Sequence, residues 1–167
     1  MSKSNLHFSL QVEGTQKKCP IGETIGHKNM TEGKTPVLSC EGACIRGEIA
    51  RLAANLVAKE QPYARSCHGE VLSVPDSAIA HWVKKAEKVV LIDGCFLHCH
   101  GRIMENLFGE EKLVQFDALS VYQKYTDVFE IDDVPEEERK KAARQVADKV
   151  LAELQMSTTP PKQVACG

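Results

Sequence analysis

The chain has 167 residues, of which 43% are hydrophobic and 26% are charged. This length and composition predict one globular domain and exclude collagen-like and wholly disordered chains. Lys and Arg total 21 against 23 for Asp and Glu, giving a net charge of -2. That balance argues against a nucleic-acid-binding protein that acts through a general basic surface.

The N-terminus and the cysteine content predict a cytoplasmic protein. The first residues show no basic lead into an apolar run, and no stretch approaches the roughly 18 apolar residues of a membrane span. We therefore expect neither secretion nor a membrane span. Seven cysteines depart from average composition, and in a reducing compartment they indicate metal ligands or reactive thiols before disulfides. The sequence names no partner, and a homo-oligomer is compatible with it.

The first half of the chain predicts an arm followed by a strand, a helix and a strand. Residues 1–34 are polar and glycine-rich without a sustained hydrophobic period, which predicts an irregular N-terminal arm. The apolar run at 35–40 opens with proline and ends in Glu-Gly, as a buried strand would. Apolar residues recur at helical spacing over 45–57. A second short strand is expected over 63–67.

The second half continues this alternation. A helix is expected to begin at Ser73, which stands as an N-cap three residues before an acid. Residues 88–92 are β-branched and apolar on both faces, as in a central parallel strand. Asp133 and Glu136 form a capping-box pattern at the start of the last helix. The other predicted elements are a helix over 95–107, a strand over 112–116, a short helix over 119–125 and a long helix over 135–154.

Strands that alternate with helices predict βαβ units. We therefore expect an α/β fold with an open, mainly parallel sheet and helices on both faces. This is a three-layer arrangement of the Rossmann-like or flavodoxin-like kind. The α/β domain is expected to span residues 35–155, and residues 156–167 a C-terminal tail.

Four cysteines are expected to meet at one edge of this sheet. Cys40, Cys67 and Cys95 each follow a predicted strand, at the edge where ligands bind in open α/β sheets. Cys99 lies four residues after Cys95, so both sulfurs should project from one side of a helix start. Four thiolates suit a tetrahedral zinc site. The domain over 35–155 is therefore predicted to bind metal.

Further residues near this edge extend the candidate ligand set. Cys44 follows Cys40 by one helical turn. Three histidines are additional candidate ligands, although alternation at a helix start predicts that they do not all point inward. Asp93 is expected to serve as an N-cap in a turn, an interpretation that we favour over acid–base chemistry. The three histidines are His68, His98 and His100.

Two alternatives to zinc stay open on these residues. An iron–sulfur cluster also accepts four thiolates. A thiol-based or metal-dependent enzyme would use Cys44 or Cys95 as a nucleophile at a helix N-terminus, where the pKa of a cysteine falls. Cys19 and Cys166 are interpreted as small apolar residues, and Cys19 is not expected to be a primary ligand.

Three segments combine into a recognisable pattern: VLSCEGA at 37–43, Ser66-Cys67, and VVLIDGC at 89–95 with Cys99 four residues later. This pattern resembles the DGC-domain family, named from the triplet at 93–95 and described as zinc-binding. The resemblance covers about residues 36–153. It implies no particular reaction. The metal ligands that it implies are Cys40, Cys67, Cys95 and Cys99.

Overall fold

The computed structural model describes residues 9 and 11–158. Most of the predicted tail over 156–167, including Cys166, lies outside the described residues, as do residues 1–8 and 10 of the predicted arm. Within the part that the structure describes, no helix combines the length and the apolar character needed to cross a bilayer.

Four parallel strands form one open sheet in the order β2-β1-β3-β4. The sequence predicted all four strands. β3 is buried along its whole length, as expected for a strand that is apolar on both faces. The strands are β1 (Thr35–Ser39), β2 (Tyr63–Arg65), β3 (Val89–Asp93) and β4 (Leu113–Asp117).

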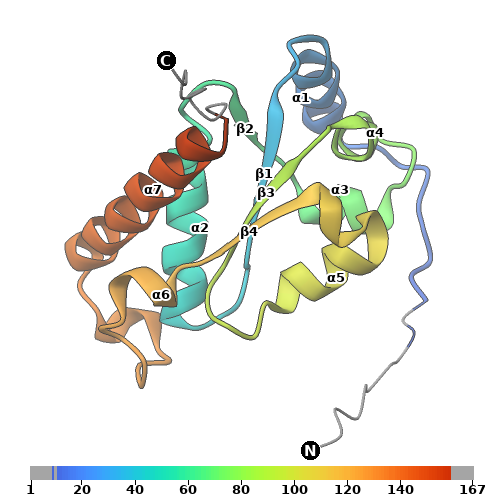
Figure 1. Cartoon of the computed structure of the whole chain (residues 1–167). Coiled ribbons are helices and arrows are strands. Elements are labelled where there is room, and N and C mark those ends of the chain that lie inside the picture. The colour runs from blue at the N-terminus through green and yellow to red at the C-terminus, as the bar shows by residue number, and fades with distance from the viewer. Residues whose placement is uncertain (1–8, 10, 159–167) are drawn as a thin grey trace, which may run out of the picture.

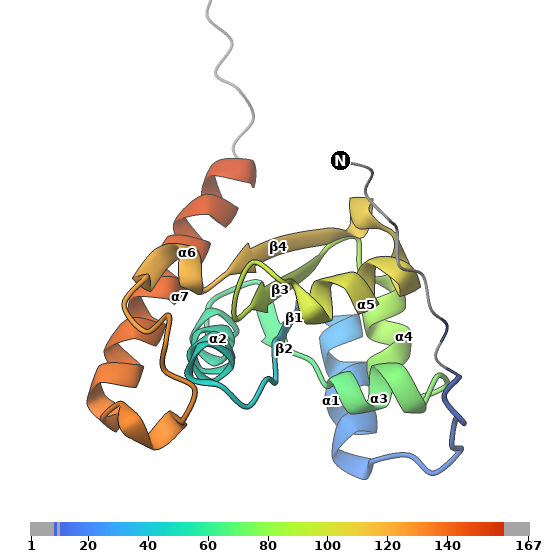
Figure 2. The same ribbon diagram turned by 90° about the horizontal axis from the view of Figure 1, so that it is seen from below.

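Helices cover both faces of the sheet (Figures 1 and 2). One face carries α2 (Ile45–Val57), α6 (Leu119–Tyr122) and α7 (Glu136–Thr158). The opposite face carries α1 (Pro20–Thr31), α3 (His68–Ser73), α4 (Ala78–Lys85) and α5 (Cys99–Phe108). Two 3-10 turns, η1 (Glu110–Lys112) and η2 (Ile131–Asp133), complete the described elements. The three-layer α/β prediction is confirmed.

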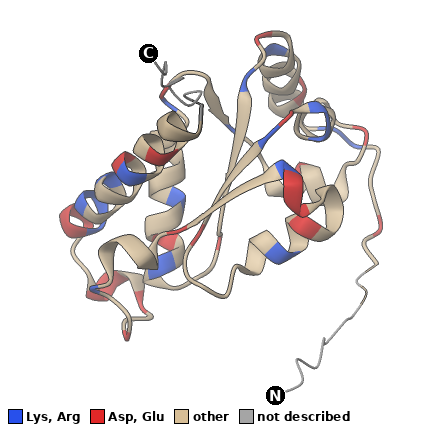
Figure 3. Cartoon of the chain, viewed as in Figure 1, with Lys and Arg blue, Asp and Glu red and all other residues tan. Residues whose placement is uncertain are grey.

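Two hydrophobic cores lie on the two faces, because successive residues of a strand point to opposite sides. Val37 and Val90 face α2 and α7, where Val146 is also buried. Leu38 and Leu91 face the other layer and pack in one cluster with Trp82 and Met104. Basic and acidic residues are interspersed along α7 (Figure 3).

The prediction of an irregular arm over residues 1–34 is wrong for α1. Two glycines suggested a loop, yet they let α1 approach its neighbours closely. A Cβ at Gly26 would overlap the backbone of Ala78 and Ile79, and one at Gly22 would overlap the Glu70 carboxylate. Cys19 is the N-cap of α1, accepting a hydrogen bond from the Gly22 amide at 3.4 Å.

Three predicted helix starts also need correction. Ser73 ends α3 and does not cap the next helix; Ser77 does, because its Oγ accepts from the Ala80 amide at 3.1 Å. α5 begins at Cys99 instead of near residue 95. α7 begins at Glu136, and Asp133 ends the 3-10 turn η2 before it.

Candidate metal centre

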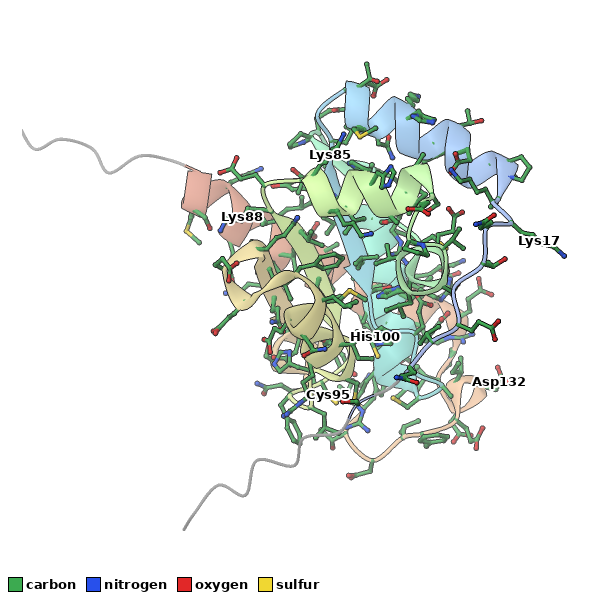
Figure 4. All side chains as sticks on the ribbon, turned by 90° about the vertical axis from the view of Figure 1, so that its right-hand side faces the viewer. Lys17, Lys85, Lys88, Cys95, His100 and Asp132 are labelled. Carbon is green, nitrogen blue, oxygen red and sulfur yellow. The ribbon has the colours of Figure 1, made fainter. Side chains whose placement is uncertain are left out.

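The candidate site lies at the carboxyl ends of β1 and β3, in the middle of the sheet. β1 leads to α2 on one face and β3 leads to α5 on the other, so the two loops diverge. A crevice at such a point is where open α/β sheets bind ligands. Figure 4 shows Cys95 and His100 at this end of the molecule, while Lys88, just before β3, lies at the opposite end.

Three side chains converge at this edge. One oxygen of Asp93, one ring nitrogen of His100 and Cys40 Sγ all lie within 4.8 Å of one another. Among the residues that the structure describes, this is the one such group of three or more metal-ligating side chains. Asp93, at the end of β3, is 1% exposed, and Cys40, directly after β1, is 9% exposed.

Backbone hydrogen bonds hold these ligating atoms. The Asp93 carboxylate accepts the amides of His100 at 3.2 Å and Gly101 at 3.1 Å, in the first turn of α5. The expectation that Asp93 serves as the N-cap is wrong, because α5 begins later and its N-cap is His98. Cys40 Sγ accepts the Gly42 amide at 3.3 Å. Burial raises the pKa of Cys40 above its usual value.

Two further imidazoles approach the same group. His98 Nδ1 lies 3.5 Å from Asp93 Oδ2, and the His68 ring meets the His100 ring edge-on at a centroid distance of 4.6 Å. Of the three histidines, His100 alone belongs to the converging group, and the expectation that they do not all point inward stays a prediction. α5 begins later than expected, so His98 precedes it in the left-handed conformation, with φ 47°, and turns toward Asp93.

The His68 imidazole is neutral. Burial, followed by the neighbouring His100 and Arg65, lowers the pKa of His68 to about 3. Its charge is therefore lost at all pH values well above 3. His68 Nε2 and His100 Nδ1 are both buried without a hydrogen-bond partner among the described residues. Buried polar atoms rarely stay unpaired, and an unpaired imidazole nitrogen is a common metal ligand.

The remaining cysteines of the predicted set are less enclosed. Cys67 and Cys99 are exposed and Cys95 is half-buried. The expectation that Cys95 and Cys99 share one side of a helix is wrong, because a turn precedes α5: the His98 amide donates to the Cys95 carbonyl at 3.1 Å. Among the described residues, no three of the four cysteine sulfurs lie within 4.8 Å of one another. The tetrathiolate set remains a prediction.

Cys44 is not a member of this group and stands at the N-cap of α2. Burial by itself would raise its pKa, but the Gly47 amide and the Arg46 guanidinium outweigh burial and hold the pKa of Cys44 below its usual value. Cys44 Sγ nevertheless accepts no capping hydrogen bond of normal geometry. Arg46 Nε and Tyr122 Oη are buried without a hydrogen-bond partner among the described residues.

A cavity of about 970 Å³ lies elsewhere, at the amino ends of the strands. Its lining includes Lys34, Tyr63, Trp82 and Lys85, and none of the described residues that line it is a cysteine or histidine. Lys85 and Lys88 mark this end in Figure 4, far from His100. The described lining of this cavity therefore offers no thiolate or imidazole ligand, and the candidate metal centre is the opposite edge.

A family model described as the DGC domain matches residues 36–146. The chain belongs to the DGC-domain family. Comparison with curated proteins and with solved structures finds no match. The matched part of the DGC domain runs from β1 into α7 and contains Cys40, Asp93 and His100 together with the other three predicted cysteine ligands. α1 lies before it.

Proposed function

We propose that this DGC domain binds a zinc ion at the carboxyl edge of its sheet, in a cytoplasmic protein. The observation that carries the proposal is the convergence of Cys40 Sγ, an Asp93 oxygen and a His100 nitrogen within 4.8 Å. Thiolate, carboxylate and imidazole are the side-chain ligands that zinc takes in proteins. Cys40 belongs both to this group and to the tetrathiolate set, so it is the ligand common to both hypotheses.

The surroundings of the site favour anionic ligands. The N-termini of α2 and α5 carry the positive ends of helix dipoles. Cys40 and Asp93 are both buried, and with Cys40 as a thiolate ligand the site would hold two anions, which is costly in a dry site. A divalent cation bound between them would offset that cost.

Replacing Cys40 with serine should abolish zinc binding. Wild-type protein purified without chelator should contain about one zinc per chain, as a mononuclear site requires, and Cys40→Ser should contain only background zinc. Cys19→Ser is the matched control: Cys19 caps α1 at a distance from the site, and serine is a preferred N-cap. Elemental analysis of both proteins checks this. Unchanged zinc in a folded Cys40→Ser protein would contradict the proposal.

The same sample distinguishes zinc from an iron–sulfur cluster. Zinc sites are colourless, whereas a cluster absorbs visible light and contains iron and sulfide. The mixture of ligand types around Cys40 favours a single ion, because clusters are held chiefly by thiolates.

A second candidate function is thiol chemistry at Cys44. The specific observation is its position beside Arg46 at the start of α2, which lowers the pKa of the thiol. Reactive cysteines occupy such electropositive, partly exposed sites. Cys44 lies outside the group formed by Cys40, Asp93 and His100, so it is available to act as a nucleophile in the presence of metal.

Alkylation of Cys44 should be fast at neutral pH. Only the thiolate reacts, so the alkylation rate rises with pH as the thiol loses its proton. A lowered pKa therefore moves the midpoint of this rise, the pH at which the rate is half-maximal, below the value of about 8.5 for free cysteine. Arg46→Gln should move that midpoint upward, because it removes the cation that stabilises the thiolate. Peptide mass spectrometry after brief iodoacetamide treatment measures both rates. A midpoint at or above that of free cysteine would refute the thiol role.

A further inference from the structure

The buried group around Asp93 contains an acidic side chain without a Lys or Arg partner and imidazole nitrogens without a hydrogen-bond partner among the described residues. Among the ion pairs of the described residues, the one basic partner of the Asp93 carboxylate is His98, at 3.5 Å, and no Lys or Arg pairs with it. Beside it, His100 Nδ1 and His68 Nε2 are buried and unpaired within the described chain. A buried carboxylate and thiol without a strong cation, next to unpaired imidazole nitrogens, lack a positively charged partner.

We infer that the metal centre is mixed and open: Cys40, Asp93 and His100 supply one sulfur, one oxygen and one nitrogen ligand, and a fourth position is free for a small anion or water. This inference rests on the proposed metal binding and specifies its ligands. The three atoms already lie within 4.8 Å of one another. Closed structural zinc sites take four Cys or His ligands, whereas three ligands of mixed type are typical of sites that keep one position open.

The other cysteines of the predicted tetrathiolate set do not complete this group. Zinc–sulfur distances of about 2.3 Å would hold four tetrahedral sulfurs about 3.8 Å apart. In the described chain, none of the other three cysteines lies with Cys40 in a group of three ligating atoms; these are Cys67, Cys95 and Cys99. Cys67 and Cys99 are exposed, each next to the start of a helix, so forming a closed site would require both loops to move inward.

Two histidines flank the open centre as positioning residues. His68 contacts the His100 ring but is not a member of the converging group, so it supports His100 from the side. His98 lies against Asp93 and also lines a cavity of about 540 Å³ with Asp117, Ser120 and Lys149. His98 therefore lies between this cavity and the carboxylate of Asp93.

X-ray absorption at the zinc edge tests the ligand set. We expect a first shell dominated by nitrogen and oxygen at about 2.0–2.1 Å, with a single sulfur at about 2.3 Å. Four sulfurs at about 2.3 Å and no nitrogen or oxygen would overturn the inference while leaving zinc binding intact. A chain that binds no zinc would instead refute the proposed function itself, so the two failures are distinguishable.

Azide tests the open position, with cobalt in place of zinc as a spectroscopic probe. Adding azide should shift the visible bands of the cobalt-loaded wild-type protein, because an anion enters the free position. An unchanged spectrum at saturating azide would contradict an open site. Two variants separate the ligand sets: His100→Gln should weaken zinc binding at least tenfold, and Cys99→Ser should leave it unchanged. The reverse pattern in folded variants would support the tetrathiolate set and overturn the inference.

Discussion

Replacing Trp82 with alanine should lower the free energy of unfolding by about 3–5 kcal/mol, the range for removing a large aromatic side chain from a core. Trp82 lies in α4, is 2% exposed and packs in one cluster with Leu38 and Leu91 of the central strands. Its Nε1 donates to the Lys34 carbonyl at 2.8 Å, which ties α4 to the residue before β1. The substitution removes this hydrogen bond and leaves a cavity beside the sheet.

Urea denaturation followed by far-UV circular dichroism measures this loss, because Trp82 is the sole tryptophan and its fluorescence disappears in the variant. Phe129→Ala is the matched control: Phe129 is 61% exposed, so its truncation should change stability by no more than about 0.5 kcal/mol. If Trp82→Ala lowered the free energy of unfolding by less than about 1 kcal/mol, α4 would contribute little to the hydrophobic core that Trp82 forms with Leu38 and Leu91.

Removing the metal should lower the melting temperature without unfolding the sheet. The proposed ligands lie on loops at one edge, while the two hydrophobic cores lie along the strands. If free zinc is at a hundredfold excess over its dissociation constant, binding contributes about 2.7 kcal/mol to stability. For a chain of this size that corresponds to roughly 5–10 °C in melting temperature.

The chelated protein should keep most of its far-UV circular dichroism and melt cooperatively. Thermal scans with and without chelator, and again after zinc is restored, measure the shift. Cys40→Ser should melt at the temperature of the chelated wild type and show no response to zinc. Collapse to a random-coil spectrum on chelation would mean that the ion holds the fold together, as in small zinc fingers.

The sheet could be predicted from sequence because its signals are local. Residues 88–92 are apolar on both faces, and only a central parallel strand buries both. α1 could not be predicted in this way. Gly22 and Gly26 weaken a helix taken by itself, and their benefit appears only where Glu70 and Ala78 approach from α3 and α4. A contact between distant segments of the chain leaves no periodic pattern near the glycines.

The place of the group formed by Cys40, Asp93 and His100 could be predicted from sequence, but its membership could not. Cys40 and Asp93 follow strands, so the sequence locates them at the carboxyl edge. Which side chains turn toward one another depends on where α5 begins, and the left-handed His98 delays that start to Cys99. This delay moves Cys99 to the surface and brings His100 toward Cys40, an outcome that cysteine spacing alone does not reveal.

The order of the strands also bears on how the chain folds. β1 and β2 are joined through α2 as a local unit, but the pairing of β1 with β3 joins residues more than 50 positions apart in the chain. Closing long loops costs entropy before any contact is gained, so such pairings form slowly. Cys40 directly follows β1 and Asp93 is the last residue of β3, so their side chains meet only when these two strands have paired. We therefore expect the ion to bind a nearly finished fold and to take no part in nucleating it.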